Sequence, residues 1–222
     1  VEEESIDLPD KLSSYTFVDY DNDGWPDQIG QNSHIAPYPL VFLHNEGNGR
    51  FSNRSDILPV QTLYTNAGHI WGDYDNDGDL DLYLANGDAA NKLLRNDGGG
   101  GFADVTSGPL GDTGDSRGSA WGDYDNDGDH DIVVLNGHPD DQIDVHRGNI
   151  NYLERTLIFE NSDGEFRNVS AESGPVFQKL YAGRGMALGD FDNDGDGDQS
   201  DFGIVQRCYS GENILADPDC AD

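Results

Sequence analysis

Short runs with apolar residues at alternate positions, separated by clusters of Gly, Asn and Asp, fill most of the chain. In residues 80–85, Leu80, Leu82 and Leu84 occupy every second position. This period is typical of a β-strand with one face on the core. Residues 132–135 (IVVL) are apolar at every position. That run predicts a strand covered on both faces by neighbouring sheets.

The runs recur as a unit of four predicted strands, which in the second unit are residues 69–74, 80–85, 92–96 and 102–106. The third and fourth runs return as FLHN and FSNRS, LLRN and FADVT, and IFEN and FRNVS. Three units follow, at about residues 15–66, 67–116 and 117–180, after a lead-in of residues 1–14. Four antiparallel strands in about fifty residues are typical of a propeller blade. The pattern therefore predicts an all-β, propeller-like array of three to four blades.

The third unit is longer than the others because of an insertion between its second and third strands, at residues 138–156. Loops in such places often contact ligands. The insertion contains His138, Asp140, Asp141, Arg147 and Tyr152. It is either a contact surface for a partner or a solvated excursion of the chain.

An acidic loop, Asp-x-Asp-x-Asp-Gly-x-x-Asp, occurs four times between the first and second runs. Calcium takes six to eight oxygen ligands in flexible geometry, and Gly at position 6 permits the turn that brings the carboxylates together. A plain polar turn would leave four carboxylates to repel one another. We therefore predict about four calcium sites, in which position 7 offers a backbone carbonyl. The predicted ligands are Asp19, Asp21, Asp23 and Asp27; Asp73, Asp75, Asp77, Asp79 and Asp81; Asp123, Asp125, Asp127, Asp129 and Asp131; and Asp190, Asp192, Asp194, Asp196 and Asp198.

The fourth loop is followed by a different pattern, so residues 188–222 form a separate segment in this interpretation. Phe202, Val205 and Tyr209 lie at roughly helical spacing, and Asp201 stands at position 12 of the loop. A calcium loop followed by a helix is the first half of a calcium–helix unit. We predict a further ligand in Asp201 and a short C-terminal helix.

The net charge of the chain limits the classes of molecule that it can bind. The 222 residues include 44 acidic and 12 basic side chains, for a formal net charge of −32. This charge argues against nucleic acids and anionic membrane surfaces as partners. No run of 18 apolar residues is present, so we expect no membrane insertion.

Three features relate to export. The acidic start of the chain lacks a basic-then-apolar order, and we interpret it as the mature N-terminus of a secreted or cell-surface protein. Cys208 and Cys220 form a local disulfide if the protein is secreted, or remain two thiols. Asn53 and Asn168 satisfy the N-glycosylation pattern.

The segments DYDNDGWPDQI, DYDNDGDLDLYLAN and DYDNDGDHDIVVLN, with second halves such as NDGGGGFADVT, resemble FG-GAP/VCBS repeats. The resemblance covers about residues 15–198. It implies blades of a calcium-carrying β-propeller, as in the integrin α-subunit head, with calcium held by positions 1, 3, 5 and 9 of each loop. The tail, GDFDNDGDGDQSDFGIVQRCYSG, resembles one half of a dockerin, an anchoring module that normally has two halves.

Blade number suggests how the protein acts. The family usually closes its ring with about seven blades, whereas this chain supplies three and the start of a fourth. An open array leaves sheet edges and blade faces exposed, and a head-to-tail contact that does not close propagates into a filament. We therefore expect self-association, or binding to an extracellular protein or glycan.

Catalysis is not expected. The acids are committed as metal ligands, and no nucleophile motif or phosphate-binding Gly loop occurs. His69, Arg117 and Arg184 precede acidic loops and either share an anion or carbohydrate contact or are ordinary strand residues. We predict a calcium-binding extracellular repeat protein with an adhesive or structural role. The alternatives are a carbohydrate-binding or carbohydrate-active module of a secreted enzyme, and a dockerin-type cargo held by a cohesin.

Overall fold

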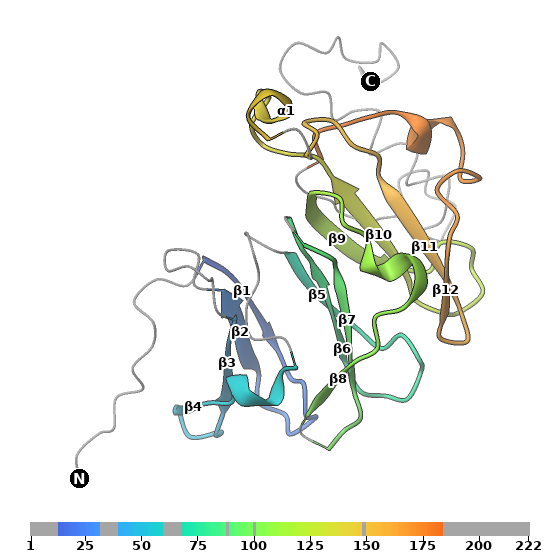
Figure 1. Ribbon diagram of the computed structural model, residues 1–222. Helices are drawn as coiled ribbons and strands as arrows, with labels where there is room; N and C mark the ends of the chain where they lie inside the picture. The colour runs from blue at the N-terminus through green and yellow to red at the C-terminus, as the bar shows by residue number, and fades with distance from the viewer. Residues whose placement is uncertain are drawn as a thin grey trace, which may run out of the picture.

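The computed structural model describes residues 13–31, 40–59, 68–87, 89–99, 101–147 and 150–183. These residues form three four-stranded antiparallel sheets, here called blades 1, 2 and 3, which follow one another along the chain (Figure 1). Within each blade the strands lie side by side in chain order. The prediction of an all-β, propeller-like array is confirmed.

The strands are short, from three to seven residues. Blade 1 comprises β1 (Ser13–Val18), β2 (Asp27–Gln31), β3 (Leu40–Asn45) and β4 (Phe51–Asn53). Blade 2 comprises β5 (Gly68–Gly72), β6 (Asp81–Ala85), β7 (Lys92–Asn96) and β8 (Phe102–Asp104). Blade 3 comprises β9 (Ser116–Gly122), β10 (Asp131–Asn136), β11 (Leu157–Ser162) and β12 (Glu165–Asn168).

Helical structure in the described residues is limited to single turns. These turns are η1 (Ser55–Ile57), η2 (Gly108–Gly111), η3 (Pro175–Gln178) and α1 (Ile143–His146). The turn α1 lies within the insertion of blade 3, where Ile143 is buried and Val145 is exposed. No helix among the described residues is long and apolar enough to cross a membrane.

The hydrophobic core lies between blades rather than within one sheet. Ile29 and Phe42 of blade 1 pack with Leu82 and Leu84 of blade 2. On the opposite face of β6, Tyr83 joins a second cluster that includes residues of blade 3. Blade 2 is therefore covered on both faces. The interpretation of residues 80–85 as a half-buried strand was wrong because Tyr83, between the two leucines, is also fully buried.

Strand β10 is covered on both faces, as its apolar run predicts. Ile132 and Val134 face blade 2, and Val133 packs with Ile158 and Phe177 in a third cluster. Phe177 belongs to η3, so this single turn covers the far face of blade 3. Blade 3 therefore packs against blade 2 on one face and against η3 on the other.

Several sequence predictions fall outside the described residues. They are the fourth acidic loop with Asp190, Asp192, Asp194, Asp196, Asp198 and Asp201, the C-terminal helix, Arg184, and the two cysteines. These predictions stay predictions. Asn53 and Asn168 are described, and both side chains are exposed at the ends of outer strands.

Candidate functional site

Three acidic loops occupy the same place in the three blades, between the first and second strands. In each loop, the Asn at position 4 adopts a left-handed conformation, with φ of 57° at Asn22 and 58° at Asn76 and Asn126. Gly at position 6 also has positive φ, for example 94° at Gly78. Gly adopts this conformation readily because it has no Cβ, and Asn tolerates it because its short polar side chain can hydrogen-bond locally. The repeated Asn-Asp-Gly therefore produces one turn three times.

The position 1 carboxylate holds the turn closed. In the second loop, Asp73 accepts the backbone N–H of Asp77 at 3.1 Å and that of Gly78 at 3.0 Å. Asp19 and Asp123 make the same pair of bonds in the other loops. The position 5 carboxylate of each loop accepts the N–H of position 7. These bonds gather the acidic side chains around one point of the turn.

The gathered carboxylates form compact groups that could hold a metal ion. In each group, one ligand atom per residue lies within 4.8 Å of the others. Positions 1, 3 and 5 come together in the first and third loops, and positions 1, 3 and 9 in the second. The groups are Asp19, Asp21 and Asp23; Asp73, Asp75 and Asp81; and Asp123, Asp125 and Asp127. Asp27 belongs to a separate group with Asp21 and His44.

The position 9 aspartate is fully buried in all three blades and ties three strands together. Asp81 Oδ2 accepts the N–H of Tyr74 at 3.1 Å, and its Oδ1 accepts the N–H of Asn96 at 2.8 Å. The equivalent bonds occur at Asp27 and Asp131. Burial raises the pKa of Asp81 to about 7 and that of Asp131 to about 6. A nearby cation would remove the cost of keeping these groups charged.

Position 7 has a role that the sequence did not reveal. Asn22 Nδ2 donates to Asp79 Oδ1 of the next blade at 3.0 Å, and Asn76 Nδ2 donates to Asp129 Oδ1 at 2.8 Å. The first loop is thereby linked to the second, and the second to the third. The predicted use of the position 7 carbonyl as a ligand stays a prediction.

A second link between blades comes from the Asn at the end of each third strand. Asn96 Nδ2 donates to the Tyr20 carbonyl of blade 1, and Asn161 Nδ2 donates to the Tyr74 carbonyl of blade 2, both at 2.8 Å. The corresponding Asn45 of blade 1 donates to Pro26 O in its own blade. The recurrence of Asn after FLH, LLR and IFE was the signal that could have identified this link.

His44 is the other functional residue that sequence reasoning missed. It stands on β3, outside the acidic loops, yet its Nδ1 lies 3.0 Å from Asp27 Oδ1 and 3.5 Å from Asp21 Oδ2. Since His44 lies outside the loops in the sequence, the spacing of the loop residues gave no sign of it. Strand pairing brings His44 beside the first loop from 17 residues along the chain.

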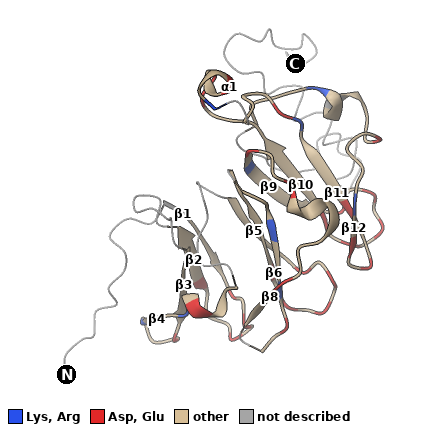
Figure 2. Ribbon diagram, in the orientation of Figure 1, with Lys and Arg blue, Asp and Glu red and all other residues tan. Residues whose placement is uncertain are grey.

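Acidic side chains dominate the strand 1–strand 2 loops, and few basic side chains lie near them (Figure 2). Burial, followed by the charge of Asp77, raises the pKa of Asp75. Burial and the neighbouring Asp127 raise the pKa of Asp125 in the same way. In addition, Asp75 Oδ1 is buried and has no hydrogen-bond partner among the described residues. Clustered carboxylates with an unpaired inward oxygen fit a hard divalent cation, which prefers oxygen ligands.

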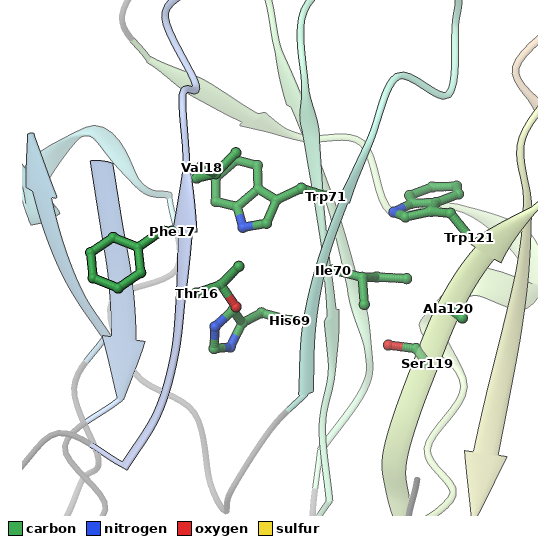
Figure 3. Close-up of a pocket in the computed structure, with 9 residues that line it drawn as sticks. All are labelled: Thr16, Phe17, Val18, His69, Ile70, Trp71, Ser119, Ala120 and Trp121. Carbon is green, nitrogen blue, oxygen red and sulfur yellow. The ribbon is translucent and has the colours of Figure 1, made fainter. Parts of the chain in front are cut away.

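A cavity of about 400 Å³ lies along the first strands of the three blades (Figure 3). In Figure 3, His69 and Trp71 of β5 point toward β1, whereas Ile70 points toward β9. The indole Nε1 atoms of Trp71 and Trp121 are buried without a hydrogen-bond partner among the described residues. Arg117, which the sequence suggested as an anion contact, is paired with Asp115 at 2.6 Å.

Comparison with known proteins agrees with this repeat architecture. A family model described as an FG-GAP-like repeat matches twice, at residues 19–84 and 73–134. No curated protein matches the chain. Among solved structures, one is similar with a TM-score of 0.42 and 20% identity, covering 69% of this chain and 37% of the other. Its title describes specific recognition of non-reducing terminal N-acetylglucosamine by an Agrocybe aegerita lectin. The chain therefore spans just over a third of that protein.

The two matches together cover more than half of the chain, from the first acidic loop to the second strand of blade 3. They coincide with the loops and strands whose geometry repeats in the structure. The chain belongs to the family of proteins built from FG-GAP-like repeats.

Proposed function

We propose that the protein is a calcium-binding extracellular repeat protein that acts by binding or self-assembly rather than by catalysis. The observation that carries this proposal is the convergence of three carboxylates in each of three equivalent loops. FG-GAP-like repeats are typical of extracellular proteins and often bind calcium. Extracellular calcium is abundant enough to occupy sites of modest affinity.

The residues of the chain have separate roles in this proposal. The position 1 carboxylate accepts the backbone N–H that orders the turn. The position 9 carboxylate links the end of the first strand to the third strand. The position 3 carboxylate of the second loop has a buried oxygen without a hydrogen-bond partner among the described residues. Bound calcium would supply positive charge that offsets the repulsion among these carboxylates. Since Asn22 links the first loop to the second and Asn76 links the second to the third, an ordered loop also stabilises its neighbour. Calcium binding is thereby coupled to the stacking of the blades.

Thermal unfolding with and without calcium tests the proposal. Each occupied site adds about 2.7 kcal/mol when free calcium is 100-fold above its Kd. We expect a large rise in Tm on adding millimolar calcium to chelator-treated protein, and a smaller rise with magnesium. Asp75→Asn, which removes one inward carboxylate from the second loop, is expected to reduce the gain. An unchanged Tm in calcium would contradict the proposal.

Self-association is supported by the exposed first strand of blade 1. Phe17, Trp71 and Trp121 each stand two residues before an acidic loop. Trp71 contacts Phe42 of the preceding blade, with ring centroids 6.3 Å apart, and Trp121 lies 6.5 Å from Tyr83 of its preceding blade. Phe17 has no preceding blade in the described chain and is 58% exposed. In Figure 3 its ring lies on the side of β1 opposite to Trp71.

The repeat geometry indicates which surface would cover Phe17. In both observed contacts, this position packs against another blade of the same kind, so we propose that a second copy of the chain docks there. In blade 1, position 7 is Trp25 instead of Asp. The contact with a second copy would therefore be more aromatic than the contacts between blades within the chain. Sedimentation analysis in calcium should show oligomers or filaments that Phe17→Asn disrupts. Val145→Ser, at another exposed apolar site, is the control. A stable monomer at all concentrations would refute self-association.

Glycan binding is a second candidate, favoured by the cavity along the first strands. Trp rings stack on sugar faces, and the buried Nε1 atoms of Trp71 and Trp121 and Oγ of Ser119 have no hydrogen-bond partner among the described residues. A glycan array should then give hits that Trp71→Phe weakens, since Phe keeps the ring packing but lacks the N–H donor. A polysaccharide-hydrolysis screen would separate binding from activity.

The dockerin alternative depends on the tail, which lies outside the described residues. Its support is the sequence of residues 188–211, where a calcium loop precedes apolar residues at helical spacing. Binding to a cohesin would show that the chain is an anchored cargo. A shortened chain ending at residue 187 would be the control.

A further inference from the structure

The three acidic loops differ in the residue that precedes the Asn at the end of the third strand. That Asn donates its backbone N–H to the position 9 carboxylate in every blade. The preceding residues, His44, Arg95 and Glu160, therefore occupy equivalent places beside their loops. Their chemistry differs, because only His44 offers a nitrogen that can act as a metal ligand at neutral pH.

His44 already lies within ligand distance of two carboxylates. Its Nδ1 is 3.0 Å from Asp27 Oδ1 and 3.5 Å from Asp21 Oδ2, and all three atoms fit within 4.8 Å. Asp27 is fully buried, and the His44 side chain is 16% exposed. The two equivalent residues are engaged elsewhere: Arg95 pairs with Asp97 at 2.7 Å, and Glu160 pairs with Arg167 at 3.1 Å.

The 3.5 Å separation between His44 Nδ1 and Asp21 Oδ2 matches a tetrahedral metal, and the 3.0 Å hydrogen-bond distance to Asp27 Oδ1 would have to lengthen by a few tenths of an ångström. Ligands bound at about 2.0–2.2 Å in tetrahedral geometry stand about 3.3–3.6 Å apart. One imidazole nitrogen and two carboxylate oxygens, with a fourth position open to water, form a donor set that zinc accepts. Calcium prefers oxygen ligands only, which the second and third loops supply. The equivalent position 3 carboxylate in the second loop turns a buried, unpartnered oxygen inward, which indicates that position 3 faces a ligand.

We infer that blade 1 contains a mixed nitrogen–oxygen metal site, formed by Asp21, Asp27 and His44, which binds zinc or a similar first-row divalent ion. Because Asp21 also belongs to the first acidic loop, zinc competes with calcium in blade 1 and leaves the second and third loops to calcium. The inference rests on the proposed metal-binding function of the loops. It extends that function to a second class of ion.

Calorimetric titration of the metal-free full chain with zinc tests the inference, and added calcium should weaken the apparent affinity for zinc because the two ions share Asp21. We expect one zinc site, and X-ray absorption at the zinc edge should show an imidazole nitrogen. His44→Gln should weaken zinc binding by more than about 100-fold, since loss of even an outer-shell partner costs 10–100-fold. His130→Gln is the control, because His130 contacts the Asp73 carbonyl but belongs to none of the metal groups in the described residues.

A variant that gains a zinc site distinguishes the loss of a metal ligand from a general loss of folding. Arg95→His places an imidazole beside the second loop and should create a second zinc site, whereas His44→Arg should abolish the first. The inference is overturned if His44→Gln binds zinc as tightly as the original protein. It is also overturned if the metal-free protein binds calcium but does not bind zinc. Loss of calcium binding with zinc binding intact would instead contradict the proposed calcium function alone.

Discussion

The Asn at the end of the third strand should stabilise the stack of blades, and its loss should cost more in blade 2 than in blade 1. Asn96 is 1% exposed and donates to the carbonyls of Tyr20, at 2.8 Å, and Leu80, at 3.3 Å. It also accepts the Gly98 N–H at 3.2 Å. Asn96→Ala removes these three bonds and leaves the buried Tyr20 carbonyl without its partner from blade 2.

The expected loss follows from those contacts. An unsatisfied buried carbonyl costs about 1–3 kcal/mol, and each other lost bond costs about 0.5–1.5 kcal/mol. We therefore expect Asn96→Ala to lower the free energy of unfolding by about 3 kcal/mol. In a chain of this size, 1 kcal/mol shifts Tm by about 2–4 °C, so Tm should fall by about 6–12 °C.

Urea unfolding followed by tryptophan fluorescence, at a fixed calcium concentration, measures this loss. Asn45→Ala is the matched control, because Asn45 donates to the exposed Pro26 carbonyl and reaches no other blade in the described residues. Water can replace that bond, and the bond that Asn45 accepts from the Gly47 N–H matches the Asn96–Gly98 bond, so the control should lose about 1 kcal/mol. Asn161→Ala should behave like Asn96→Ala, since Asn161 reaches the Tyr74 carbonyl. Equal losses at Asn45 and Asn96 would refute the inter-blade role.

Two further predictions concern pH and backbone conformation. Burial raises the pKa of Asp81 to about 7 in the folded, metal-free protein, so between pH 4 and 7 the folded state binds more protons than the unfolded state. Metal-free stability should therefore fall as pH rises, by about 4 kcal/mol from this group, and Asp81→Asn should flatten the slope of Tm against pH. Gly137 has φ of +131°, and an added Cβ would lie 2.6 Å from the Tyr181 carbonyl oxygen, so Gly137→Ala should lower the free energy of unfolding, measured in urea, by about 2 kcal/mol or more. Gly128→Ala, with positive φ but open space around it, should cost about half as much; equal losses would argue against the steric reason.

The sequence by itself determined the repeat, the four strands of each unit and the turn of the three described acidic loops. Alternating apolar residues define strands, and Asn-Asp-Gly defines the turn, because both signals act over a few neighbouring residues. The positions of Asp123, Asp125 and Asp127 within one turn made their convergence foreseeable. Local spacing was enough for those conclusions.

Only the tertiary structure decided which residues from other strands and blades reach the loops. His44 meets Asp27 because β2 and β3 pair, and Asn96 meets the Tyr20 carbonyl because blade 2 stacks on blade 1. Likewise, Tyr83 is buried because blade 3 covers the face of β6 that the alternating pattern predicted to be exposed to solvent. Burial and contacts between blades depend on how distant segments pack, and no local pattern encodes that packing.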